Sequence, residues 1–174
     1  MWDENRAADL TFVEQLDYYG KLGSQFPAPP LRLLYTASGT QPAATILRDA
    51  LSVIEHNIYW SAPTTISEAN YLAAILNSES ARARAAAGQS RGQWGARHFD
   101  KVVFNLPIPR YDSKLKLHRD LAAVAVKAEK IAAVVALPEG VKFQRARALV
   151  RTALGDAGVM QSIDALVTQL LDGA

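Results

Sequence analysis

The feature that most limits the fold is an apolar seam in the long stretch from Ser113 to Leu137. Its members follow one another at alternating steps of four and three residues, which is the spacing of a heptad helix. They are Leu117, Leu121, Val124, Ala128, Ile131 and Val135. A row of this length facing water would be a costly exposed patch, so the helix needs a cover.

The sequence is compatible with two ways of covering the seam. Further helices are predicted at 141–155 and 159–171, and the break at "PEG" is short enough for them to fold back as antiparallel neighbours. We favour this arrangement. The alternative cover is the same helix of a second chain, or a helix of a separate catalytic partner.

The part before Ser113 mixes helix and strand signals. Helices are predicted at 6–23 and at 67–88, the second with Ser67 as its N-cap and with a buried stripe at Tyr71, Leu72, Ile75 and Leu76. "RLLYTASGTQPAATIL" predicts a β-hairpin with Gly39 in its turn and Pro42 at the second strand's start or edge. "NIYWSAP" and "KVVFNLPIP" predict two more short strands.

These elements predict an α+β fold, in which a small antiparallel or mixed sheet with a hairpin is flanked by helices. A C-terminal helical hairpin or bundle follows. We expect residues 1–112 to form the α+β domain and residues 113–174 the helical unit. With 49% apolar and 21% charged residues, the chain is rich enough in core formers to exclude disorder.

The sequence lacks the residues that several classes of function require. The chain has no cysteine, which excludes disulfides, thiolate metal sites and a cysteine nucleophile. No apolar run spans a bilayer, and the polar start "MWDENRAADL" is unlike a signal peptide, so we expect a cytoplasmic protein without membrane contact. His56, His98 and His118 are scattered, without metal-ligand spacing, and we expect His118 on the surface.

The sequence also gives little support for a catalytic site. "GQSRG" at 88–92 fits the nucleophile motif G-x-S-x-G, but a helix-forming stretch precedes Ser90 where the motif requires a strand. We interpret Ser90 as a polar loop residue. No glycine pattern of a nucleotide-binding loop is present, so we expect no cofactor, no metal and no catalytic activity of the chain alone.

Charge is unevenly spread along the chain. Residues 82–119 hold nine Lys and Arg against Asp100 and Asp112, a net charge of +7, while the remainder carries −5. Inside this stretch lies the basic segment, residues 87–112, with Arg91, Arg97, Lys101 and Arg110 around Trp94 and His98. Such a block is either a contact for a polyanion or a solvated face.

The order of motifs resembles a known family. "YLAAILNS" is followed by a basic, glycine-containing stretch, by "FNLPIP" and by the heptad helix. This order is similar to the target-recognition region at the C-terminus of bacterial adenine-specific DNA methyltransferases, including the large type IIG restriction-modification proteins, and to type I specificity subunits. The resemblance covers roughly residues 30–137. The family's catalytic core, with its cofactor glycines, is missing from this chain.

The resemblance implies a module that recognises double-stranded DNA and serves a methyltransferase catalytic domain or subunit. Arginine forks onto guanine and glutamine onto adenine, while other cations meet phosphate. The candidate DNA-binding residues are Arg82, Arg84, Arg91, Gln93, Trp94, Arg97, His98 and Lys101, with Ser38, Thr40 and Gln41 at the hairpin tip. Trp94 either stacks on bases or covers its own core, and the three hairpin residues have a plain role as turn residues.

A second function of another class stays open. In it the chain is a helical assembly module whose heptad surface binds a protein partner, and the basic segment is only solvated. A homo-oligomer is compatible with either function.

Overall fold

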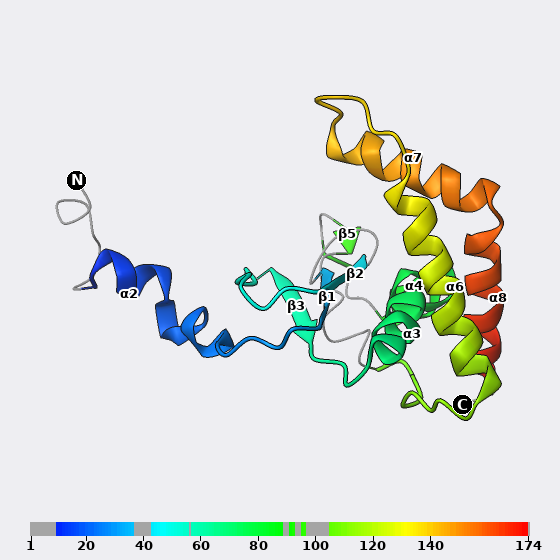
Figure 1. The fold of residues 1–174 in the computed structure, drawn as a ribbon, viewed down its shortest axis with the longest axis horizontal. Coiled ribbons are helices and arrows are strands. Elements are labelled where there is room, and N and C mark those ends of the chain that lie inside the picture. Colours follow the sequence, from blue (N-terminus) through cyan, green and yellow to red (C-terminus); the bar gives the residue numbers. More distant parts are fainter. Residues whose placement is uncertain are drawn as a thin grey trace.

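A computed structural model describes residues 10–36, 43–55, 57–88, 91–92, 95–96 and 105–173, and residues 87–88, 91–92 and 95–96 are described by backbone only (Figure 1). In chain order the elements are α2 (Phe12–Leu16), the 3-10 helices η1 (Tyr18–Gly20) and η2 (Gly23–Gln25), β1 (Arg32–Thr36), β2 (Ala44–Leu47), β3 (Ile58–Ser61), α3 (Ile66–Asn77), α4 (Glu79–Gly88), β4 (Arg91–Gly92), β5 (Gly95–Ala96), α6 (Lys116–Ala133), α7 (Phe143–Asp156) and α8 (Val159–Asp172). The predicted α+β class is confirmed.

The three-stranded sheet is antiparallel, in the order β2–β1–β3. Side chains alternate between the faces of a strand, so Leu33 and Tyr35 of β1 point to one side. There they are buried together with Ala73 and Leu76 of α3. The predicted pairing of the hairpin strands and the third strand are both confirmed, while Gly39 and Pro42 lie outside the described residues.

The helix predicted at 67–88 is two helices, α3 and α4, which divide at Ser78. The backbone of Ser78 is extended there, with ψ of 147°. Its start was also predicted two residues late, because the N-cap is Thr65 and not Ser67. The Glu68 N–H donates to Thr65 Oγ1 at 3.1 Å, and this bond fixes the first turn.

The N-terminal helix is shorter than predicted: within the described residues it covers only Phe12–Leu16, opened by a capping box of Thr11 and Glu14. Asp17 ends it, because its Oδ1 accepts the N–H groups of Leu22 and Gly23. Tyr19 and Gly20 then adopt left-handed backbone conformations. Figure 1 shows this segment projecting from the rest of the protein. Apolar side chains of this segment are exposed: Val13 is 71% and Leu16 57% accessible.

The heptad seam is covered within the chain. Leu121 is fully buried, and Leu117, Val124, Ala128 and Ile131 are partly buried against the same core. α8 returns along α6 after α7, which crosses the ends of both helices (Figure 1), so the fold-back arrangement is present. α3 covers the other side of the seam, which the sequence did not predict. The core therefore joins residues from before and after position 112.

The fourth predicted strand is only partly testable. Residues 101–104 lie outside the described part, and residues 105–109 are irregular and not a strand. The two prolines there, Pro107 and Pro109, have no N–H to donate to a ladder. Leu106 and Ile108 instead pack on the helical core, and Pro109 accepts the Tyr71 hydroxyl at 2.9 Å.

Candidate nucleic-acid interface

The basic segment, residues 87–112, begins in the last turn of α4, which ends at Gly88. Three residues later the chain forms β4, which pairs antiparallel with β5 through Arg91 opposite Ala96 and Gly92 opposite Gly95. The sequence pattern predicted only a loop here, and this ladder was missed. The signal was present in "RGQWGA", where glycines flank a two-residue connection of the kind that joins hairpin strands.

Few of the predicted DNA-binding side chains can be located. Arg82 and Arg84 are fully described, and Arg91 is described by its backbone in β4. The others lie outside the described residues, namely Gln93, Trp94, Arg97, His98, Lys101, Ser38, Thr40 and Gln41. Of these, Gln93 and Trp94 form the connection between the paired strands in the sequence.

Arg82 and Arg84 are bound to carboxylates of the chain itself. Arg82 pairs with Glu79 one turn earlier on α4, and Arg84 pairs with Asp172 at the end of α8. The hydrogen bond from Arg82 lowers the pKa of the Glu79 carboxyl, so this pair is charged at neutral pH. Their guanidinium groups are partly exposed, and a phosphate contact by either would compete with these internal partners.

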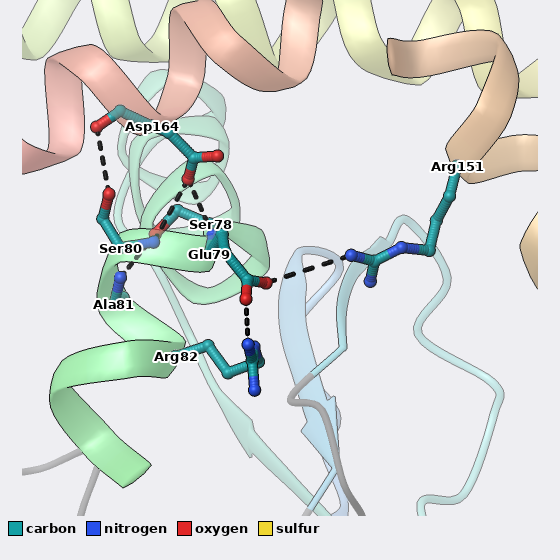
Figure 2. Close-up of polar contacts among 7 residues, drawn as sticks. All are labelled: Ser78, Glu79, Ser80, Ala81, Arg82, Arg151 and Asp164. Atoms are coloured by element: carbon teal, nitrogen blue, oxygen red, sulfur yellow. Dashed lines mark hydrogen bonds and ion pairs between the residues drawn. The ribbon is translucent and has the colours of Figure 1, made fainter. Parts of the chain in front are cut away.

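The start of α4 is held by side chains rather than by the preceding helix (Figure 2). Asp164 of α8 accepts the backbone N–H groups of Glu79 and Ser80 through Oδ1, at 2.7 and 3.2 Å. Ser78 accepts the third, from Ala81, at 3.0 Å. The first N–H groups of a helix have no intrahelical partner, so these three bonds replace the missing ones.

Glu79 also reaches beyond its own helix. In Figure 2 its carboxylate faces both Arg82 and Arg151 of α7, whose Nη2 is 3.9 Å away. Together with Asp164, this contact ties the first turn of α4 to both C-terminal helices. The sequence gives no sign of these pairs, because their members lie more than seventy residues apart.

The "ILNS" motif acquires a physical role from these contacts. Ile75 and Leu76 are buried in the two cores, and Ser78 caps α4. Asn77 binds the sheet edge: its Oδ1 accepts the N–H of Ala44, and its Nδ2 donates to the Ala44 carbonyl, at 3.0 and 2.9 Å. The motif thus joins the hairpin, the core and the helix that leads into the basic segment.

His118 is buried, and not on the surface as predicted. It packs against Tyr71 with ring centroids 4.7 Å apart, and its Nδ1 accepts the N–H of Asp112 at 2.9 Å. An acceptor at Nδ1 requires the neutral ring with its proton on Nε2. Burial lowers the pKa of His118, and the nearby Asp112 charge opposes this shift.

We therefore expect the protein to lose stability on mild acidification. The folded-state pKa lies below the unfolded value of about 6.5, so the unfolded chain binds the proton more readily. The contribution of His118 is complete above about pH 6.5 and declines as the pH falls towards the folded-state pKa. Urea unfolding of wild type and His118→Gln between about pH 5 and 8 measures this difference. Parallel pH profiles of the two proteins would contradict it.

The described residues offer little for other chemistry. No group of three or more His, Cys, Asp or Glu among them is placed to hold a metal ion. An open polar hollow of about 620 Å³ lies between the start of α3 and Arg110. The N-terminus of α3 at this hollow is capped by Thr65, whose Oγ1 accepts the N–H of Glu68 at 3.1 Å, and the Glu68 carboxylate accepts the N–H of Thr64 at 2.7 Å. Among the residues that the structure describes, no helix has the length and apolar character needed to cross a bilayer.

Comparisons of the chain with known protein families, with curated proteins and with solved structures found no match. The functional interpretation therefore depends on the residues themselves.

Proposed function

We propose that this chain is a DNA target-recognition module of a restriction-modification or DNA methyltransferase system. It binds double-stranded DNA in the cytoplasm and leaves methyl transfer to a separate catalytic domain or subunit. The observation that carries the proposal is the two-stranded ladder of β4 and β5 inside the basic segment. The major groove of DNA admits a two-stranded ribbon as readily as a helix.

The residue types around the ladder fit this role. Arg91 lies in β4, and Gln93 and Trp94 form the connection in the sequence. Arg97 and Lys101 follow within ten residues of Arg91. Phosphate contacts supply affinity and bidentate arginine or glutamine contacts supply base discrimination, so the segment holds both kinds of residue.

The second candidate function is a protein-assembly module. As an assembly module, the chain would bind a partner through its heptad surface. Leu121 and Ile131 of that surface pack against the chain's own core. A different observation favours an assembly role, because the projecting N-terminal segment exposes Phe12, Val13 and Leu16. That segment offers apolar contacts for the proposed catalytic partner, which makes the two functions compatible.

Replacing Arg91 by alanine tests the DNA proposal. Removing one cation that binds a phosphate lowers the slope of log affinity against log salt by about one unit. We expect such a decrease, or a relaxed sequence preference if Arg91 reads a base. The matched control is Lys21→Ala, which removes the same charge from an exposed position on the N-terminal segment. Fluorescence anisotropy with labelled duplex DNA gives the measurement, and equal behaviour of both variants would count against Arg91.

A further inference from the structure

The basic segment is closely tethered to α4. The helix ends at Gly88, and β4 begins at Arg91. Three residue steps span at most about 11 Å, so the position of α4 restricts where the ladder can lie. The contacts that hold α4 in place therefore also restrict the position of the proposed DNA-binding ladder.

α4 has little apolar packing of its own. Its sequence, "ESARARAAAG", contains no large apolar side chain, and Ala81 and Ala85 are its buried residues where side chains are described. Alanine buries little area, so hydrophobic contact alone anchors this helix weakly. Its polar contacts then carry a larger share of the attachment.

Those polar contacts lead to one stripe of α8. Asp164 accepts two N–H groups from the first turn of α4, Thr168 Oγ1 lies 2.8 Å from Ser80 Oγ, and Asp172 pairs with Arg84. The three α8 residues are spaced by four, which puts them on one face of the helix. The adjoining face carries the buried residues Ile163 and Val167. α8 thus uses one face for the core and another to hold α4.

We infer that Asp164 is a positioning residue for the basic segment, which it controls by capping α4 from the last helix of the chain. This inference rests on the proposed function for its consequence in DNA binding. Without the Asp164 carboxylate, the N–H groups of Glu79 and Ser80 have no acceptor, and the first turn of α4 frays. The ladder then has to be ordered when DNA binds, which weakens affinity without removing any phosphate contact.

The test compares Asp164→Ala with Asp164→Asn in the full chain. Asparagine removes the same charge but keeps an oxygen that caps a helix well, so it separates capping from long-range electrostatics. Gln161→Ala, at an exposed position of α8, is the control for changes elsewhere on that helix. Amide hydrogen exchange follows α4 and the β4–β5 ladder, and anisotropy across a salt series follows duplex DNA.

For Asp164→Ala we expect exchange in α4 and the ladder to rise about fivefold while α6 stays protected, since one cap is removed and the core is intact. DNA affinity falls by a similar factor of about five, with the salt slope unchanged. Asp164→Asn restores most of both quantities, and Gln161→Ala matches wild type.

Three outcomes would overturn the inference: unchanged exchange in α4, faster exchange with undiminished affinity, or an asparagine variant as impaired as the alanine variant. Absence of DNA binding by wild type itself would instead defeat the proposed function. Exchange at the ladder then decides alone whether Asp164 positions the basic segment.

Discussion

Replacing Leu121 by alanine is expected to cost about 2–5 kcal/mol in the free energy of unfolding. Leu121 has no exposed surface and lies in the core shared by α3, α6 and α8, where Tyr71 and Val167 are also fully buried. Truncation removes packing from all three helices and leaves a cavity that they cannot readily close. For a chain of this size the midpoint of thermal unfolding should fall by about 10 °C.

The mass in solution distinguishes this arrangement from the alternative cover of the seam. Because α3 and α8 cover Leu121 within one chain, we expect the variant and the wild type to have the same mass by light scattering. Lys127→Ala, on the exposed face of α6, is the control and should shift stability by less than about 0.5 kcal/mol. A wild-type oligomer that becomes a folded monomer on truncation of Leu121 would show that a second chain covers the seam.

Removing three cations of the basic segment should have the largest effect on binding. We expect the triple variant Arg91→Ala, Arg97→Ala, Lys101→Ala to lower the salt slope by about three units and to abolish measurable affinity near physiological salt. Lysine and arginine side chains are seldom fully buried, so we expect the unfolding midpoint to stay near the wild-type value. A folded triple variant with unchanged DNA affinity would contradict this prediction.

The parts of the fold that sequence could predict are those set by local periodicity. The heptad spacing located α6 to within three residues of its start, and the two apolar runs around "SGTQP" located β1 and β2. The third strand and both C-terminal helices follow from similarly local signals. In each case the buried face is determined by residues close together in the chain.

The errors arise where a distant partner decides the local structure. Alanine-rich sequence continues through Ser78, yet the helix divides there, because Asp164 offers the new helix a cap from eighty-five residues away. His118 resembles a polar surface residue until Tyr71 and the Asp112 N–H are placed beside it. Arg82 and Arg84 resemble free cations in the sequence, although Arg84 meets Asp172 only through the return of α8.

The candidate interface is less determined than the fold. Composition predicted its charge, and the spacing of glycines in "RGQWGA" would have predicted the ladder had it been taken as a hairpin signal. Sequence spacing cannot show which cations are bound internally. The division of the chain at position 112 and the identity of the catalytic partner stay predictions.

The central claim, that the basic segment binds DNA, is tested most directly by titrating the wild-type chain with duplex DNA across a salt series. If Arg91, Arg97 and Lys101 each neutralise one phosphate, affinity should fall about 40-fold between about 50 and 200 mM salt, on a straight line of log affinity against log salt. Binding that is absent at low salt, or that is independent of salt while the chain is folded, would contradict the claim.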